Sequence, residues 1–129
     1  MQLMKIGRFI ENKYHGSFEM ASTIAQYFQE AGEVVAACDY WIKAAVYANQ
    51  KLSPELAKTA CRNAENLLLI NSDLFSEEQI HQLYDVLSQT FYLERNIVEL
   101  RRNADKVLAL GKKHQSALLL VAGYSMHAN

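Results

Sequence analysis

Glu78 and His81 are the residues whose types and spacing could bind a metal. A Glu-x-x-His motif puts a carboxylate and an imidazole on one face of a helix, and di-iron four-helix bundles use two such motifs with two further carboxylates. The sequence has no second copy of the motif, because Glu11 and His15 are four residues apart. Acidic residues in the first turn stabilise a helix through its dipole. We therefore interpret Glu77 and Glu78 as first-turn charges and predict no metal site.

Cys38 and Cys61 could form a redox pair, since they would lie on neighbouring helices. Each falls on an apolar helical face, and free cysteine is among the most buried residue types. Two reduced, buried thiols fit a cytoplasmic protein better than a disulfide framework. The sequence also lacks zinc-site spacing, a Gly-x-Ser-x-Gly elbow and a phosphate-binding Gly-x-x-x-x-Gly-Lys-Ser/Thr loop. We therefore predict no catalytic residue, no cofactor and no enzymatic activity.

A basic cluster follows residue 100 and consists of Arg101, Arg102, Lys106, Lys112 and Lys113. A nucleic-acid site would need interleaved aromatic residues and a basic total, whereas the net charge is −1. Cations near the end of a helix stabilise its dipole, so we interpret most of the cluster as a solvated face. Arg101 is either a residue at the edge of the core, with its aliphatic stem packed, or a contact for a carboxylate of a partner.

The apolar residues recur at helical spacing in six segments, and no strand is predicted. Gly32 and Gly111 are expected to end two of the helices. Short connections predict that successive helices pack antiparallel. The chain contains no linker or low-complexity stretch, so we expect a single domain over residues 1–129. The predicted helices run from Phe18 to Gly32, Val34 to Ala48, Ser53 to Leu68, Ser76 to Phe91, Asn96 to Gly111, and about His114 to Tyr124.

Three of these helices begin with recognisable capping residues. Ser53 is the expected N-cap of the third helix, followed by Pro54 at the first helical position. The next two starts resemble capping boxes, in which Ser or Asn is followed three residues later by Gln or Glu. These boxes are Ser76 with Gln79, and Asn96 with Glu99.

Small and large residues recur along the chain with one spacing. Ala37, Trp41 and Ala44 stand at positions 0, +4 and +7, Ala57, Cys61 and Ala64 repeat the pattern, and Ile97, Arg101 and Ala104 repeat it poorly. Small residues at the outer positions let two helix backbones approach, and a bulky one fills the gap between them. Stacked helix hairpins of this kind form a solenoid. Trp41 is expected to be buried.

Residues 18–49 resemble one tetratricopeptide repeat. The likeness rests on Ala21, Ile24, Ala25, Phe28, Gly32, Ala37, Trp41 and Ala44. The segment differs from the family pattern at Ala21, where Trp is common, and at Asn49, where a Pro often closes the motif; the following unit has Leu52 in place of the turn glycine. The resemblance implies an all-α, antiparallel helix-hairpin, right-handed solenoid of about six helices.

A narrower resemblance begins with residues 10–48. These look like the helical region that follows the ATPase module in bacterial ATPase-coupled adenylate cyclases and maltose-regulator-like transcription activators. The shared motifs are Ala25 to Gly32, Tyr40 to Ala44, and Ala60 to Leu68. This resemblance implies a regulatory region of a longer signalling protein.

The leading functional hypothesis is a docking domain that binds a partner protein or adjacent domains of its own chain. The alternative, implied by the resemblance, is a domain that senses a small-molecule inducer. Tyr40 and Tyr47 are seven residues apart and so share a helix face, which makes them, with Arg101, the candidate partner-binding residues. We expect no nucleic-acid or membrane partner, since the run Ala117 to Gly123 is too short to span a bilayer. That apolar run in the last helix predicts self-association.

Overall fold

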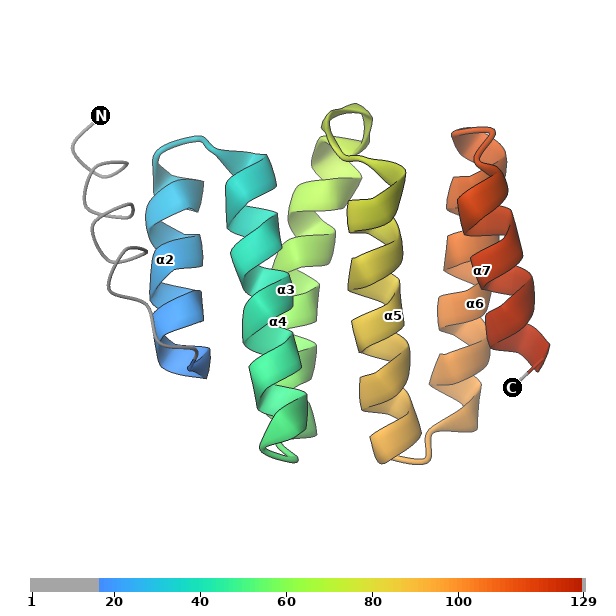
Figure 1. The fold of residues 1–129 in the computed structure, drawn as a ribbon, viewed down its shortest axis with the longest axis horizontal. Coiled ribbons are helices and arrows are strands. Elements are labelled where there is room, and N and C mark those ends of the chain that lie inside the picture. The colour runs from blue at the N-terminus through green and yellow to red at the C-terminus, as the bar shows by residue number, and fades with distance from the viewer. Residues whose placement is uncertain (1–16, 129) are drawn as a thin grey trace.

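The computed structural model describes residues 17–128, and these form an all-α fold. Glu11 and His15, and the first part of the segment 10–48, lie outside the described residues. The described part contains six α-helices, one short 3₁₀ helix and no strand, as predicted (Figure 1). In chain order they are α2 (Phe18–Glu30), α3 (Val34–Gln50), α4 (Pro54–Ile70), η1 (Ser72–Leu74), α5 (Glu77–Leu93), α6 (Ile97–Lys113) and α7 (Ala117–Ala128).

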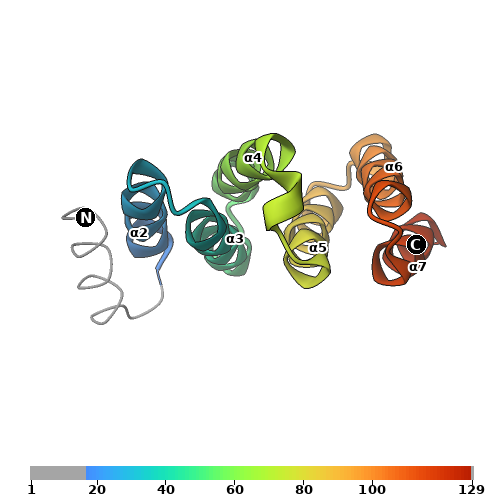
Figure 2. The same cartoon turned by 90° about the horizontal axis from the view of Figure 1, so that it is seen from above.

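Successive helices run antiparallel and follow one another along the long axis of the molecule (Figure 1). Seen from above, the helices alternate between two layers, with α3, α5 and α7 in one and α4 and α6 in the other (Figure 2). Within the first layer α3 contacts α5, and α5 contacts α7. These three helices consequently share one broad face.

Four of the five connections between the described α-helices are built by the same turn. Each contains one residue in the left-handed region: Gly32 (φ 80°), Leu52 (φ 56°), Arg95 (φ 57°) and Gln115 (φ 51°). In each turn the N–H of the following residue donates to the carbonyl five residues back, as in the bond from Glu33 to Phe28 at 2.8 Å. This is a Schellman ending, in which a left-handed residue reverses the chain immediately after the helix.

The predicted stop at Gly32 is confirmed, whereas the predicted stop at Gly111 is wrong. Helix α6 continues to Lys113, and the left-handed residue is Gln115. Gly111 is instead a contact point, because a Cβ there would lie 3.0 Å from the backbone nitrogen of Leu120. The last helix correspondingly begins at Ala117, later than the predicted His114.

The predicted capping residues occupy the expected positions, but neither capping box is complete, since the backbone N–H of Asn96 donates to the Phe91 carbonyl at 2.9 Å and the Glu99 side chain pairs with Arg102. Asn96 Oδ1 accepts from the backbone N–H of Glu99 at 3.1 Å, and Ser76 Oγ accepts from that of Gln79 at 3.1 Å. The Gln79 side chain does not complete a capping box and donates to the Val35 carbonyl of α3 at 3.0 Å. Ser53 is the N-cap of α4 by position, but its side chain makes no capping hydrogen bond.

The core is rich in alanine, which brings the helices close together. Four of the predicted contact residues are fully buried, namely Ala37, Ala44, Ala57 and Ala64. Trp41 is 5% exposed, as predicted, and its Nε1 donates to Gln29 Oε1 of α2 at 3.1 Å. Cys38 and Cys61 are buried free thiols. Together these residues form the interior between α2, α3 and α4.

The third predicted unit, with Ile97, Arg101 and Ala104, is in the wrong register. Ile97 and Arg101 are both exposed. Ala37, Ala57 and Leu100 each lie five residues after the left-handed residue of the preceding turn. Leu100 is therefore the residue of α6 that corresponds to the two alanines. The cause is the longer connection between α4 and α5, which includes η1 and breaks the spacing of 20 residues between the Gly32 and Leu52 turns. The units in register are 37–41–44, 57–61–64 and 100–104–107.

Candidate functional site

A groove of about 980 Å³ lies over the C-terminal half of α5. We call it the α5 groove. Residues of α3 line one side, residues of α5 form the centre, and single residues of α6 and α7 line the other side. The lining residues are Val46, Asn49, Gln50, Asp85, Ser88, Gln89, Tyr92, Leu93, Leu100 and Met126.

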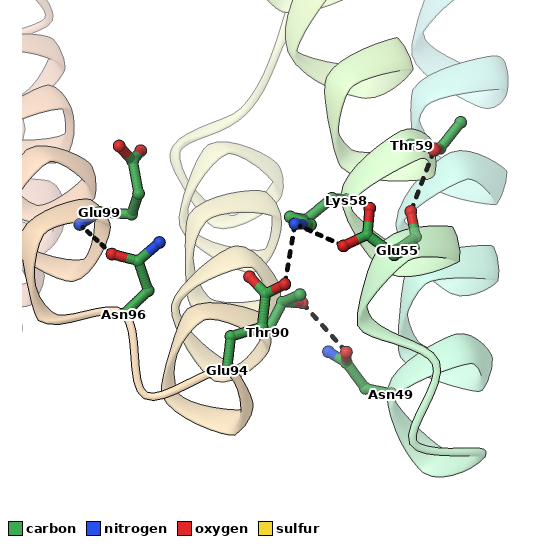
Figure 3. A network of polar contacts seen from close by, with 8 residues as sticks. All are labelled: Asn49, Glu55, Lys58, Thr59, Thr90, Glu94, Asn96 and Glu99. Carbon is green, nitrogen blue, oxygen red and sulfur yellow. Dashed lines mark hydrogen bonds and ion pairs between the residues drawn. The ribbon is translucent and has the colours of Figure 1, made fainter.

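A polar contact fixes α3 against α5 beside the groove (Figure 3). The buried Thr90 hydroxyl lies 3.0 Å from Asn49 Oδ1 and 3.0 Å from the Val86 carbonyl, and it donates to one of them. Asn49 Nδ2 donates to the same Val86 carbonyl at 3.3 Å. Because buried polar groups are costly without partners, this contact sets how far apart the two helices lie.

The opposite wall is positioned by Asn103 of α6, which is buried. Its Nδ2 donates to the Tyr84 carbonyl at 2.8 Å and to Ser88 Oγ at 2.6 Å. Ser88 Oγ in turn contacts Met126 Sδ of α7 at 3.7 Å. One amide side chain thus ties α5 to α6, and through Ser88 to α7. Sequence reasoning missed Asn103, although a polar residue inside the apolar stripe of α6 was a visible sign of a buried contact.

The entrance to the groove combines polar and apolar side chains. Gln89 Nε2 donates to Asp85 Oδ2 at 3.2 Å on the exposed face of α5. Tyr92 is 74% exposed at one end, and Leu93 beside it is also exposed. Apolar surface next to hydrogen-bonding groups suits a peptide, which presents both kinds of group to its binding site.

Charged residues gather on the other side of α5, where they pair with one another. Lys58 of α4 contacts Glu55 at 3.0 Å and Glu94 at 2.8 Å (Figure 3). The hydrogen bonds with Glu94 and Glu55 raise the pKa of Lys58. Lys106 of α6 contacts Glu65 of α4 at 3.3 Å. These pairs cross from α4 to the end of α5 and to α6, so they link the helices.

Tyr84 belongs to the same group of contacts and is deeply buried. Its hydroxyl donates to Glu65 Oε2 at 2.7 Å. Burial, and secondly this hydrogen bond, raise the pKa of Tyr84. The smaller cleft here, about 320 Å³, is bordered largely by charges that already have partners within the chain. We therefore regard this cleft as structural and the α5 groove as the candidate site.

The predicted partner-binding residues do not come together. Tyr40 is only 6% exposed, and its ring stacks on Phe28 with centroids 5.8 Å apart. Lys43 Nζ lies 4.3 Å from the centroid of the same ring. Tyr47 is half-buried and packs against the core. Neither tyrosine lines the α5 groove, and Arg101 is exposed on α6. The role of the three residues in partner binding stays a prediction. Tyr40 has little exposed surface with which it could contact a partner.

The residues considered for metal and redox chemistry lie apart from the groove. Glu78 is exposed, and His81 is half-buried one turn further along α5. Residues 17–128 contain no group of three or more His, Cys, Asp or Glu side chains that could hold a metal ion. Burial raises the pKa of both the Cys38 and the Cys61 thiol to about 12. Within the same range no helix is long and apolar enough to cross a membrane.

Comparisons with known proteins return no match. No protein-family model, no curated protein and no solved structure is significantly similar to the chain.

Proposed function

We propose that this chain is a non-catalytic docking domain that binds a peptide segment, from a partner protein or an adjacent domain, in the α5 groove. The observation that carries the proposal is the groove itself. Residues of four helices line it, its volume is about 980 Å³, and its lining combines apolar side chains with side chains that form hydrogen bonds. Such a surface can hold both the main chain and the side chains of a peptide.

The repeated turn supports a tetratricopeptide-like, right-handed solenoid as the architecture behind this function. The helices α3, α4, α5 and α6 are each 17 residues long, and small residues lie at the contacts between α3 and α4. In such a stack one layer of helices faces a ligand, and here that layer is α3, α5 and α7. A regulatory role in a cytoplasmic signalling protein belongs to the same proposal, supported by the resemblance of residues 10–48 and by the reduced thiols.

A small-molecule sensor is the second candidate, and the volume of the groove favours it. Ligand pockets typically have volumes of about 300–1,000 Å³ and are lined by apolar and aromatic residues. The α5 groove has one aromatic lining residue, Tyr92, which is largely exposed, and half of its lining residues are polar. A surface of this kind suits an extended peptide better than an enclosed ligand.

Selection of displayed random peptides on the purified chain tests the proposal. Enriched peptides are then measured against Gln89→Arg and Tyr92→Ala, which alter exposed lining residues. Gln82→Arg is the matched control, because Gln82 is exposed on the same helix but does not line the groove. We expect the two groove variants to weaken binding about tenfold or more and the control to bind as the wild type does. Equal affinity for all four proteins would contradict the proposal.

The exposed face of α7 supports self-association as a further part of the proposal. Leu119 is fully buried, and Leu120 packs over Gly111 of α6. Val121 and Tyr124 point away from these contacts, with Val121 64% exposed. Burial of such side chains against a second copy would remove apolar surface from water and so favour association.

A further inference from the structure

The lining of the α5 groove carries a single charge among the residues that the structure describes. This charge is the carboxylate of Asp85, and the other lining residues are apolar or uncharged. Asp85 lies on the α5 side of the groove and is exposed. A ligand in the groove therefore meets a negative charge that is open to contact.

The carboxylate of Asp85 is only partly engaged by the chain itself. Gln89 stands one turn further along α5, and its Nε2 donates to Asp85 Oδ2 at 3.2 Å. Within residues 17–128 this is the one polar contact of Asp85, and no cation pairs with it. The second carboxylate oxygen, Oδ1, is left as an acceptor for a donor on a ligand.

The unpaired state of Asp85 distinguishes the groove from the charged cleft on the other side of α5. In that cleft Glu94 pairs with Lys58 at 2.8 Å, and Glu65 pairs with Lys106 at 3.3 Å. Those carboxylates are neutralised within the chain, whereas Asp85 leaves the lining of the α5 groove with a net negative charge. A cleft lined by one sign of charge focuses the field on its contents, so the groove favours cations and repels anions.

An aromatic and apolar surface lies at a fixed separation from this carboxylate. Tyr92 follows Asp85 by seven residues on the same helix. Seven residues make two helical turns, so the two side chains share a face and stand about 10 Å apart along the axis. Tyr92 is 74% exposed, and Leu93 beside it also lines the groove. The α5 side of the groove thus has an acidic end and an apolar end.

We propose that the α5 groove selects a peptide segment with a basic residue on Asp85 and an apolar residue on Tyr92 and Leu93. The inference rests on the docking function proposed above and names the class of peptide. A lysine or arginine can donate to the Asp85 carboxylate, whereas an acidic residue there is repelled. An extended chain rises about 3.3 Å per residue, so the basic and the apolar residue lie about two to four positions apart.

A charge-swap selection tests this inference. A displayed library of random peptides is selected separately on the wild type, on Asp85→Lys and on Glu78→Lys. Glu78→Lys is the matched control, because Glu78 is an exposed carboxylate on the same helix and does not line the groove. We expect the wild type and the control to enrich a basic and an apolar residue at the proposed spacing. Asp85→Lys should enrich Asp or Glu in place of the basic residue.

The affinities of one peptide selected on the wild type complete the test. This peptide should bind Asp85→Lys about tenfold or more weakly than the wild type and the Glu78→Lys control. Asp85→Asn removes the charge and keeps the shape, so its loss of affinity should be smaller. A copy of the peptide with Glu in place of its basic residue should prefer Asp85→Lys to the wild type. These substitutions alter exposed residues and should leave the urea midpoint nearly unchanged.

Two results would overturn the inference and leave the docking function standing. The first is a set of enriched peptides that Tyr92→Ala weakens but that share no basic residue, or that bind the wild type and Asp85→Lys equally. The second is a dimer of the wild type that Asp85→Lys dissociates in sedimentation, since a second copy would then occupy the groove. Failure to enrich any peptide on the wild type would contradict the docking function and this inference together.

Discussion

Leu108 of α6 packs directly on the backbone of Gly123 of α7. A Cβ on Gly123 would lie 2.7 Å from Leu108 Cγ, closer than such atoms approach in proteins. One turn earlier in α7 the arrangement is reversed, with Leu120 packed over Gly111 of α6. The last two helices therefore interlock through two glycines and two leucines, which brings Met126 to the edge of the α5 groove.

This contact predicts that Gly123→Ala destabilises the protein. Alanine is the better helix former, so the substitution would stabilise an unhindered helix by about 1 kcal/mol. The added methyl group must instead displace Leu108, and overpacking of this kind typically costs about 1–3 kcal/mol. Urea unfolding should show a net loss of stability for Gly123→Ala and none for Ser125→Ala, an exposed control on the same helix. A gain in stability for Gly123→Ala would show that the two helices are not so close.

The helices were predictable because each carries an apolar stripe or a capping residue, and Pro54 and Ser76 mark helix starts in the sequence itself. The turns were only partly predictable. The glycine at position 32 indicates a left-handed residue, whereas Arg95 and Gln115 adopt the same conformation although they are not glycines. Their conformation is imposed by the packing of the helices on either side, which a local pattern does not contain. The predicted helix end at Gly111 was wrong for the same reason, because this glycine serves a tertiary contact with α7.

Truncation of Trp41 is predicted to destabilise the protein more than truncation of any other single side chain in α2, α3 or α4. It is buried between α2 and α3, and its indole N–H already has a partner in Gln29. Trp41→Ala should lower the free energy of unfolding by about 3–5 kcal/mol, because a large cavity remains. As the only tryptophan, it should also give blue-shifted fluorescence in the native state. Emission like that of free tryptophan in water would contradict this burial.

The buried thiols predict that stability falls as the pH rises above about 9. Burial raises the pKa of Cys38 and Cys61 from 9.0 to about 12. Below pH 9 the two thiols are protonated in both the folded and the unfolded chain. Above pH 9 the thiols of the unfolded chain lose their protons, whereas those of the folded chain keep them. The free energy of unfolding should therefore fall by about 2–3 kcal/mol between pH 8 and pH 10.

Urea unfolding at several pH values measures this effect, and the Cys38→Ala/Cys61→Ala double variant is the control. The double variant is expected to be less stable at pH 8 but to lose less stability on going to pH 10. Tyr84, whose pKa is also raised, contributes in the same sense above its ordinary value of 10.0. An identical pH dependence in the two proteins would mean that the thiols are not the groups responsible.

Self-association through α7 is tested best at Val121. This residue is exposed, whereas Leu120 contacts Gly111 and its replacement would disturb α6 as well. We expect the wild type to sediment as more than a monomer at micromolar concentration and Val121→Glu to sediment as a monomer. Gln115→Glu, an exposed charge change in the turn between α6 and α7, should leave association unchanged. A wild type that is strictly monomeric would rule out a self-associating face.

The α5 groove was not predictable from the sequence, because its walls come from helices that are far apart along the chain. Asn49 and Thr90 look like ordinary polar residues until the fold places them 3.0 Å apart. Tyr40 illustrates the reverse case, in which a residue type common in binding sites is used for packing against Phe28. Spacing along one helix identifies a shared face, but the neighbouring helix decides whether that face is open.

The most direct test of the account is to map where a selected peptide binds. Backbone amide chemical shifts of the ¹⁵N-labelled protein are followed while the peptide enriched on the wild type is added. The largest changes are predicted at residues 46–50, on one side of the α5 groove, and at residues 85–93, in its centre, with little change at Lys58 and Lys106 on the other face. Changes centred on Lys58 and Lys106, with residues 46–50 and 85–93 unaffected, would contradict the central claim that the α5 groove is the docking site.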